Sequence, residues 1–405
     1  MSINRRSLLT AAAATMLSPV ATAQTVRTGS WDVIVIGAGV FGVWTAWQLL
    51  QTGARVLLVD AWGPGHGRAS SGGETRLIRT EYRGDPLYTR WAWESLAAWK
   101  ALSARHELPL FHETGALYLY PDETDVIDRS IAAQRALTVP VEKLMPGELS
   151  RRWPQIDFAR IAVGVLQPTM GALMARRSVQ MLVADFVGRG GAYRQVAVAP
   201  PQPASKRLDA VISVDGERLT AGTFVFACGP WLPKLFPEVI GARIVPTRQD
   251  VFFFAPPPGD SRFGPERLPA WVDASSPDLH YGFPDIEARG FKIALDRHGP
   301  VVDPDAGDRR ITDQALTDVR AYLRRRFPAL ASRPLAEARV CQYENSDNCD
   351  LLIDQHPQLS NALIVGCGSG HGFKHGPAVG RYVTGLVTGG GRAEPRLQIG
   401  AHHEH

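Results

Sequence analysis

Residues 31–60 contain the pattern that most constrains the fold of this chain. They read WDVIVIGAGVFGVWTAWQLLQTGARVLLVD, which is an apolar run, a glycine-rich turn, an amphipathic stretch and a second apolar run ending in an acid. Short apolar runs bounded by turn signals are typical of buried strands, and apolar residues at helical spacing are typical of an amphipathic helix. The order therefore predicts a strand, a tight turn, a helix and a second strand in one short unit.

The three glycines of the turn suit positions that a side chain would obstruct. Gly37 permits a tight turn after the first strand, and Gly39 lets the backbone approach a pyrophosphate group. Gly42 lets the helix pack closely against the strand. In this context GAGVFG predicts a dinucleotide-binding site, and the alternative is a glycine-rich turn without a ligand.

The expected ligand contacts follow from the same pattern. The pyrophosphate would lie against the amide groups and positive end of the helix that begins near Gly39, at Val40 and Phe41. Asp60 follows Gly42 by eighteen residues, close to the spacing of an acid that binds a ribose hydroxyl. These residues do not distinguish FAD from NAD, because Asp60 could hold the adenosine ribose of either.

Length, charge and cysteine content narrow the class of protein. A chain of 405 residues is expected to form two domains, since single cores stop growing at about 250–300 residues. The net charge is only +4 and the basic residues are dispersed, which argues against nucleic acid as a partner. Four cysteines are too few for a disulfide scaffold, and their spacing matches no familiar zinc site, so no metal is expected.

The first 23 residues have the features of an export signal. Arg5 and Arg6 precede a mild apolar run, and residues 21–23 form a small-residue cleavage pattern. The paired arginines predict twin-arginine export, and hence a periplasmic or secreted protein. The alternatives are an uncleaved membrane anchor or an unstructured tail, but the run falls short of about 18 clean apolar residues. No later segment is expected to insert into a membrane.

Helical and strand patterns alternate along the rest of the chain. A strand ending on a small-residue turn is expected at TFVFACGPW, and NALIVGCGSGHGFKHGPAVGRYV reads as strand, glycine loop and helix. Both strands are expected to join the sheet of the first unit. The alternation favours α/β or α+β structure. Further helices are predicted over 87–104, 124–137, 177–187 and 313–325, and a further strand over 116–120.

Five motifs occur in a fixed order between about residue 31 and about residue 395. They are GAGVFG, TRLIR, HYGFP with a following FK, CQY and SGHGFK. In this order they resemble the monomeric sarcosine oxidase and N-methyltryptophan oxidase family, flavin amine oxidases of the D-amino-acid-oxidase superfamily. The resemblance implies FAD as the cofactor, a small amino acid or amine as the substrate, dioxygen as the oxidant and a monomeric protein.

The resemblance also implies the domain organisation. The expected fold class is α/β with an α+β second domain. A Rossmann-like FAD-binding domain would be built from the discontinuous segments 30–112, 172–243 and 349–398. An antiparallel-sheet substrate domain would be built from 113–171 and 244–348.

Two further cofactor contacts are expected. Family members attach FAD covalently through the cysteine of a Cys-x-Tyr segment, and Cys341 with Tyr343 matches that segment. A thiolate can attack the methyl carbon of the flavin ring, which fixes the cofactor and raises its oxidising power. The alternative for Cys341 is a buried free thiol. Gly370, in the loop of SGHGFK, is the other expected contact.

The TRLIR motif supplies two arginines. Arg76 and Arg79 are three residues apart, a spacing that on a helical turn aims both side chains at one place. By resemblance Arg76 lies over the flavin ring, whereas Arg79 and Lys374 hold the substrate carboxylate. A guanidinium fork and a second positive charge suit that task. The alternative is salt bridging at the surface.

The resemblance gives catalytic roles to four more residues. Lys292 in GFKIALD matches the lysine beside the flavin where dioxygen reacts, because a positive charge stabilises forming superoxide. His371 matches an active-site histidine, and Tyr281 and Tyr343 match aromatic walls of the substrate cavity. The alternatives are an exposed strand lysine, a loop histidine bonded to backbone and ordinary core tyrosines.

Two segments depart from the family pattern. Relatives carry a histidine four residues after the dioxygen lysine, where this chain has Asp296, and ENSDNCD replaces a threonine-rich stretch. The expected function is an FAD-dependent oxidase of secondary α-amino acids, N-methyl or cyclic, that yields an imine and hydrogen peroxide. A dehydrogenase that passes electrons to a quinone or cytochrome and a non-catalytic flavin-binding protein are the alternatives. The sequence specifies neither the substrate side chain nor the carbon oxidised.

Overall fold

The structure covers the part of the chain that carries all of the predicted site residues. The computed structural model describes residues 30–275 and 279–403. The predicted export signal, residues 1–23, lies outside the described residues. Within the described residues, no helix has the length and apolar character needed to cross a membrane.

The two apolar runs of the first unit form neighbouring strands of one sheet. Strand β1 (Trp31–Ile36) pairs in parallel with β2 (Val56–Asp60) on one side and with β11 (Arg218–Phe226) on the other. Helix α1 (Val40–Gln51) connects β1 to β2. Both strands are almost fully buried, which explains their nearly continuous apolar sequence.

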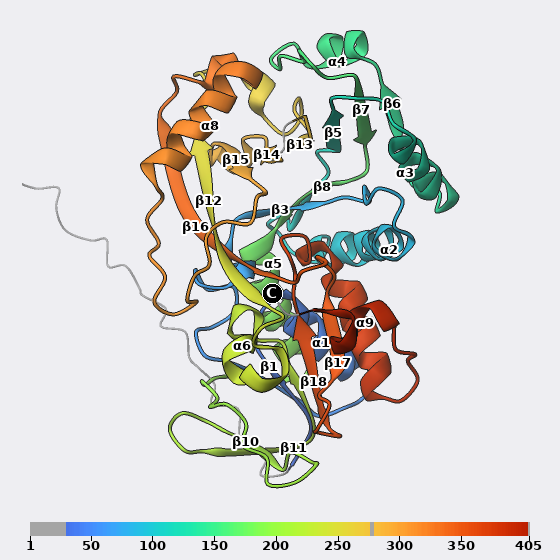
Figure 1. The fold of residues 1–405 in the computed structure, drawn as a ribbon, viewed down its shortest axis with the longest axis vertical. Coiled ribbons are helices and arrows are strands. Elements are labelled where there is room, and N and C mark those ends of the chain that lie inside the picture. The colour runs from blue at the N-terminus through green and yellow to red at the C-terminus, as the bar shows by residue number, and fades with distance from the viewer. Residues whose placement is uncertain (1–29, 276–278, 404–405) are drawn as a thin grey trace, which may run out of the picture. The chain divides into compact units, whose positions relative to one another are not determined.

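The first sheet has seven strands, in the order β17-β18-β11-β1-β2-β9 with β10 paired to β11. Strand β18 joins β11 in parallel, and β17 pairs with β18 antiparallel at the edge. Helix α1 contacts both α5 and α9 beside this sheet (Figure 1). The predictions that β11 and β18 join the first sheet are confirmed. The remaining bounds are β9 (Ala192–Gln195), β10 (Ala210–Ile212), β17 (Leu352–Gln355), β18 (Ala362–Gly366), α5 (Ala175–Gly188) and α9 (Gly376–Val387).

The second sheet has eight strands, in the order β16-β12-β15-β14-β13-β5-β7-β6. All neighbours pair antiparallel except β13 and β5, which are parallel. The prediction of an α/β fold with a mainly antiparallel second sheet is confirmed. The strands are β5 (Ala116–Tyr120), β6 (Glu142–Leu144), β7 (Val163–Gln167), β12 (Val245–Phe254), β13 (Ala270–Asp273), β14 (His280–Phe283), β15 (Phe291–Leu295) and β16 (Leu335–Asn345).

Each large sheet draws its strands from one predicted domain. Every strand of the first sheet lies in the three segments assigned to the FAD-binding domain, and every strand of the second lies in the two segments assigned to the substrate domain. The described residues from Trp31 onward nevertheless group as a single unit. The domain boundaries therefore stay a prediction.

The TRLIR segment is a strand, so the predicted helical turn at Arg76 and Arg79 is wrong. Strand β3 (Thr75–Ile78) pairs antiparallel with β8 (Gly171–Met174) in a third, three-stranded sheet. Both ends of β3 are β-branched residues, which favour extended backbone. Arg76 lies within the strand and Arg79 directly after it. Both side chains nevertheless line one cavity.

The helices predicted from apolar spacing are present within a few residues of their expected ends. Helix α2 begins after Asp85, whose carboxylate accepts hydrogen bonds from the amides of Leu87 and Tyr88. Helix α8 contacts β15 of the second sheet. The remaining bounds are α2 (Pro86–Ser103), α3 (Asp125–Ala136), α4 (Pro146–Arg152), α6 (Leu232–Leu235), α7 (Pro237–Ile240), α8 (Asp313–Arg326) and strand β4 (Phe111–His112).

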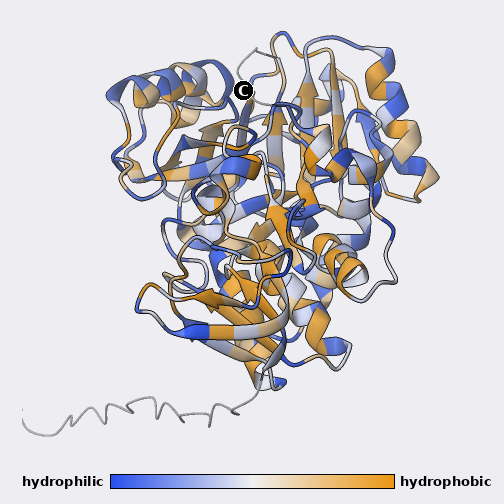
Figure 2. Ribbon diagram, turned by 60° about the horizontal axis from the view of Figure 1, so that its bottom comes forward, coloured by the Kyte–Doolittle hydropathy of each residue, from blue (hydrophilic) through white to orange (hydrophobic). Residues whose placement is uncertain are grey.

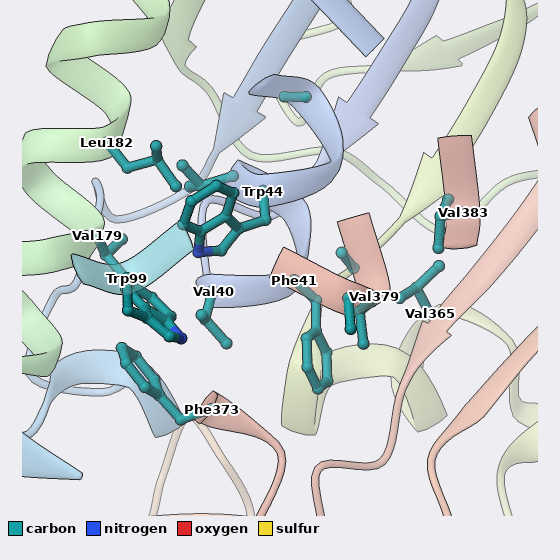
Figure 3. Packing of buried hydrophobic residues seen from close by; sticks show 14 of the residues in the cluster. Val40, Phe41, Trp44, Trp99, Val179, Leu182, Val365, Phe373, Val379 and Val383 are labelled. Atoms are coloured by element: carbon teal, nitrogen blue, oxygen red, sulfur yellow. The ribbon is translucent and has the colours of Figure 1, made fainter. Parts of the chain in front are cut away.

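The largest hydrophobic core joins the helix of the glycine loop to the elements around Lys374. Figure 3 shows side chains of α1, α2 and α9 packed together, among them Phe41, Trp44, Trp99 and Val379. The Trp99 ring stacks on Phe373, with 5.5 Å between the ring centroids. In Figure 2 the strands are mainly hydrophobic, whereas the helices carry hydrophobic and hydrophilic residues together. This packing links the cofactor end of α1 to the segment that carries Lys374.

Candidate active site

The glycine loop has the close backbone contacts that its sequence predicts. Gly37 has φ of +104°, and a Cβ atom on it would lie 2.3 Å from the carbonyl oxygen of Ala227. A Cβ on Gly42 would lie 1.9 Å from the carbonyl oxygen of Gly37. Neither position can accept a side chain without movement of the backbone. Gly39 has more room, with Ser71 Oγ as its nearest neighbour at 3.6 Å.

A cavity of about 450 Å³ opens at the carboxyl ends of the first-sheet strands, beside this loop. We call it the glycine-loop cavity. Ligands of open α/β sheets bind at such an edge. Of the predicted cofactor contacts, Gly42 and Cys341 do not line this cavity. Those that do are Gly37, Gly39, Val40, Phe41, Asp60 and Gly370.

The carboxylate of Asp60 holds the glycine loop as well as facing the cavity. Its Oδ2 accepts a hydrogen bond of 2.7 Å from the amide of Ala38. Its Oδ1 accepts bonds of 2.8 Å from the amides of Trp62 and Gly63. Asp60 therefore organises the loop through backbone contacts, and binding of a ribose hydroxyl would add to that role.

A second cavity, also of about 450 Å³, lies between the third sheet, the second sheet and the SGHGFK loop. We call it the tyrosine cavity, because Tyr82, Tyr118, Tyr281 and Tyr343 line it. Its wall also contains the other predicted substrate residues and the departure noted above: Arg79, His371, Lys374 and Asp296. The two cavities share four residues, which are Arg76, Tyr343, Gly370 and Phe373. The two cavities are therefore adjacent.

The cationic group of Lys374 is held by neutral partners. Its Nζ donates hydrogen bonds to the Tyr82 hydroxyl at 3.0 Å and to the carbonyl of His371 at 2.7 Å. The indole of Trp99 donates to the Lys374 carbonyl at 2.8 Å, which fixes the backbone. Burial and the nearby Arg79 guanidinium lower the pKa of Lys374 well below its usual range, although Asp296 opposes the shift.

Arg79 is held in a similar way. Its guanidinium lies over the Tyr82 ring at 4.2 Å and donates to the carbonyl of Glu81. Among the described residues, neither Arg79 nor Lys374 forms a salt bridge with a carboxylate. The alternative of surface salt bridging therefore does not apply to these two side chains within the part of the chain that the structure describes. Arg79 keeps its positive charge, and an anionic ligand would favour the charged form of Lys374.

Tyr82 also connects two histidines. His371 Nε2 lies 2.8 Å from the carbonyl oxygen of Cys349 and must donate to it, so His371 Nδ1 accepts from the Tyr82 hydroxyl at 3.1 Å. His375 Nε2, 2.6 Å from that hydroxyl, then donates to it, and His375 Nδ1 has no partner among the described residues. Burial and Lys374 lower the pKa of His371 to about 3 and that of His375 well below its usual range. Both rings are therefore neutral at pH 7.

Asp296 places one carboxyl group in the tyrosine cavity. Its Oδ1 accepts a hydrogen bond of 3.0 Å from the Tyr343 hydroxyl, which lies 3.5 Å from the Tyr281 hydroxyl. Burial raises the pKa of Asp296, although the Tyr343 bond and the charges of Arg79 and Lys374 oppose the shift. The cavity therefore presents an acid as well as two cations.

Lys292, Arg76 and Cys341 form a third group, next to the shared wall. Lys292 Nζ donates to the carbonyl and the hydroxyl of Thr75 at 2.7 and 3.1 Å. Burial and Arg76 lower the pKa of Lys292 well below its usual range. Arg76 Nη2 donates to the carbonyl of Ser70 at 2.8 Å and lies 3.9 Å from Cys341 Sγ. Lys292 is buried rather than an exposed strand lysine, and neither it nor Cys341 lines the two cavities.

Tyr82, His375 and Glu344 are among the residues of this site that the sequence predictions missed. Tyr82 ends the TRLIRTEY stretch, and His375 follows Lys374, so proximity to a motif was the available signal. Glu344 follows Tyr343 and is the first residue of the departure ENSDNCD. Its side chain lines the glycine-loop cavity. That position depends on the pairing of β16 with β12, which sequence spacing does not specify.

The comparison with known proteins agrees with this architecture. The family model described as FAD dependent oxidoreductase matches residues 32–386. The chain belongs to this family. Membership in the FAD dependent oxidoreductase family implies FAD as the cofactor. The glycine-loop cavity fits it, because glycines leave the backbone accessible while Ser70 Oγ and Glu344 Oε2 are buried in its wall without partners among the described residues.

Relatives within the FAD dependent oxidoreductase family confirm the predicted resemblance. The monomeric sarcosine oxidase of Bacillus sp. (strain B-0618) is 28% identical over 375 residues, 89% of this chain and 93% of that protein. The N-methyl-L-tryptophan oxidase of Salmonella arizonae is 27% identical over 355 residues, 86% of this chain and 92% of that protein. The solved structure of L-proline dehydrogenase from P. horikoshii shares the fold, with a TM-score of 0.80, 22% identity and coverage of 91% and 97% of the two chains.

Proposed function

We propose that this protein oxidises secondary α-amino acids, N-methyl or cyclic, at the wall shared by the two cavities. The observation that carries the proposal is the pair formed by Lys374, which is buried, and Arg79, which is half-buried; both line the tyrosine cavity without a salt-bridged carboxylate among the described residues. A buried cation is stabilised by an anion. The α-carboxylate of an amino acid supplies that anion.

The remaining groups of the cavity suit the rest of an amino acid. Arg79 offers a planar fork for two carboxylate oxygens, and Lys374 offers a point charge beside it. Asp296 is placed to pair with the substrate ammonium group and to accept its proton, which frees the nitrogen lone pair. Tyr118, Tyr281 and Tyr343 would enclose the apolar part of the substrate.

The reaction would proceed at the shared wall. A bound FAD would supply the acceptor for the hydride of the substrate carbon and the donor of two electrons for the reduction of dioxygen to hydrogen peroxide. The chain's residues hold the carboxylate, receive the amine proton and exclude water while the hydride moves. The imine product is hydrolysed by water to an amine and a carbonyl compound. Lys292 would supply the positive charge near the site of dioxygen reduction.

We propose that Cys341 bonds covalently to FAD. The sulfur of Cys341 lies 3.9 Å from Nη2 of Arg76, a residue that lines both cavities, so the thiol is next to the shared wall. Acid precipitation and denaturing electrophoresis should leave flavin fluorescence on the protein band, and Cys341→Ser should remove it. Release of all flavin from the unmodified protein would contradict the bond.

We further propose export by the twin-arginine route to the periplasm or medium. Signal cleavage and cell fractionation would test this proposal. We also propose a monomeric state, which light scattering would test.

One observation favours a second function, that of a dehydrogenase. Lys292 donates to Thr75 and does not line either cavity, so its charge is not directly presented to a small molecule there. An enzyme that passes electrons to a quinone or a cytochrome needs no such charge.

An anaerobic titration followed by air tests these proposals together. The purified flavoprotein is titrated with sarcosine, N-methyltryptophan, proline, pipecolate and primary amino acids while flavin absorbance is recorded. Bleaching by a secondary amino acid, with colour and peroxide returning in air, is expected for the oxidase. Bleaching without recovery in air would establish the dehydrogenase. A flavin that no amine bleaches would contradict both.

A further inference from the structure

Glu344 is a buried carboxyl group that the proposed reaction does not use. It lies near the end of β16, directly after Tyr343, and 6% of its surface is exposed. Its Oε1 accepts a hydrogen bond of 3.2 Å from the amide of Gly368. Its Oε2 is buried and has no hydrogen-bond partner among the described residues. Buried carboxyl oxygens without a partner are costly, so a missing partner is expected.

The missing partner belongs in the glycine-loop cavity. Glu344 lines this cavity together with Cys228, Gly229 and Gly368. A Cβ on Gly229 would lie 3.3 Å from Oε2, and a Cβ on Gly368 would lie 3.4 Å from Oε1. Two glycines from different strand ends thus leave the carboxyl group uncovered on the side of the cavity.

The surroundings of Glu344 disfavour its charged form. It forms no salt bridge with a described residue, and the titratable groups that face it are the thiols of Cys228, after β11, and Cys367, after β18. Burial is the largest cause that raises the pKa of both thiols, so both are neutral at pH 7. Burial likewise raises the pKa of Glu344 to about 7, although the amides of Gly368 and Cys367 oppose the shift.

We propose that Glu344 is a cofactor-binding residue that carries a proton in the complex and donates it in a hydrogen bond to FAD. FAD has many acceptor oxygens and nitrogens, and its phosphates add negative charge that disfavours an ionised carboxyl group nearby. A protonated carboxyl group can donate one hydrogen bond to an acceptor atom of FAD. That bond gives the buried carboxyl oxygen the partner it lacks. This inference rests on FAD as the cofactor and is independent of the substrate.

Proton uptake should make FAD binding dependent on pH. The bound form keeps the proton, whereas free Glu344 loses it above about pH 7. Binding is therefore tightest below that pH and weakens above it, by up to tenfold for each pH unit. Between pH 6 and pH 8.5 the dissociation constant of FAD should rise about 30-fold.

The test measures FAD affinity rather than turnover. Apoproteins of Cys341→Ser, alone and combined with Glu344→Gln or Glu344→Leu, are titrated with FAD at pH 6 and pH 8.5, and flavin fluorescence is followed. The dissociation constant of FAD for Cys341→Ser alone should show the 30-fold rise. The glutamine variant keeps a donor but cannot titrate, so its affinity should not change with pH. The leucine variant should bind FAD about tenfold more weakly than the first at pH 6.

Ser70→Ala is the matched control, because Ser70 Oγ is also buried without a described partner in the same cavity. It should weaken binding without removing the pH dependence. Equal affinity of the leucine variant, or an undiminished pH dependence of the glutamine variant, would overturn the proposal. The same Glu344 and Ser70 substitutions are also made with Cys341 intact, and flavin uptake is measured at both pH values. Agreement between the two series shows that the result does not depend on the serine substitution. If the unmodified protein oxidises no secondary amino acid while FAD affinity keeps its dependence on pH and on Glu344, the proposed function fails and this inference stands.

Discussion

The Nζ atom of Lys374 donates a hydrogen bond of 3.0 Å to the hydroxyl of Tyr82, across 292 positions in the sequence. The partner is a neutral hydroxyl whose pKa is raised by burial, and it also bonds two neutral histidines. No described carboxylate forms a salt bridge with this lysine, and burial disfavours its charged form. An amino-acid carboxylate can therefore become its counter-ion.

Removing this hydroxyl should weaken substrate binding. Tyr82→Phe keeps the ring under Arg79 but removes a hydrogen bond to a charged group, which contributes about 1.5–3 kcal/mol. We expect KM for a secondary amino acid to rise at least tenfold with a smaller change in kcat. Tyr118→Phe, on the same cavity wall, is the control. An unchanged KM would show that Tyr82 does not position Lys374.

Replacing the lysine itself should cost more. Lys374→Met removes one of the two cations, and loss of a buried charged partner costs about 2–5 kcal/mol in binding. The amino-acid dissociation constant, measured from anaerobic flavin bleaching, should rise at least thirtyfold. An N-methyl amine without a carboxylate should bind equally well to both proteins. A similar loss for that amine would point to general damage of the cavity.

The acid in the tyrosine cavity should control the pH dependence of substrate binding. Because burial raises the pKa of Asp296, its carboxylate becomes protonated at a higher pH than an ordinary aspartate as the solution is acidified. The ammonium group then loses its partner, so kcat/KM should fall on the acid side. Asp296→Asn should lower kcat/KM at pH 8 and flatten that acid limb. If the acid limb of the kcat/KM profile is unchanged in Asp296→Asn, a group other than Asp296 is responsible for that limb.

Lys292 separates the two candidate functions. If its charge assists dioxygen reduction, Lys292→Met should slow reoxidation of reduced flavin by about 10²–10³-fold. Anaerobic reduction by the amino acid should change little. Both half-reactions can be followed by stopped-flow absorbance at the flavin band. Equal reoxidation rates in the two proteins would favour the dehydrogenase.

A buried ion pair should control stability in the second sheet. Arg326 Nε donates to Asp273 Oδ2 at 2.8 Å, and both side chains are 1% exposed. Arg326→Met leaves the acid unpaired, which should lower the free energy of unfolding by about 3–5 kcal/mol. Urea denaturation followed by tryptophan fluorescence measures this, with the exposed Arg324→Met on the same helix as control.

The same pair predicts loss of stability in acid. Burial disfavours the carboxylate of Asp273, but Arg326 and hydrogen bonds from Ser275 and Tyr322 outweigh it and lower its pKa. The stabilisation is complete above the unfolded pKa of about 3.9. It is lost as pH falls through the lower folded value. Arg326→Met should show a smaller loss between pH 5 and pH 2 than the unmodified protein.

Much of the fold could be predicted because its signals are local. The glycine loop, α1 and the flanking strands lie within thirty residues, and each depends on neighbours in the chain. The TRLIR segment shows the limit of local reasoning. A three-residue spacing suggested a helical turn, but pairing with β8, almost one hundred residues later, selected a strand.

The sequence by itself determined the βαβ unit, the order of motifs and therefore the family, because these depend on residue types at fixed spacing. Only the tertiary structure decided that Tyr82 meets Lys374, that Lys292 bonds to Thr75, and that Glu344 faces the glycine-loop cavity. Sequence spacing does not specify which distant strands pair or how deeply a side chain is buried. Burial and partners set whether a lysine or an acid is charged, and so what it can bind.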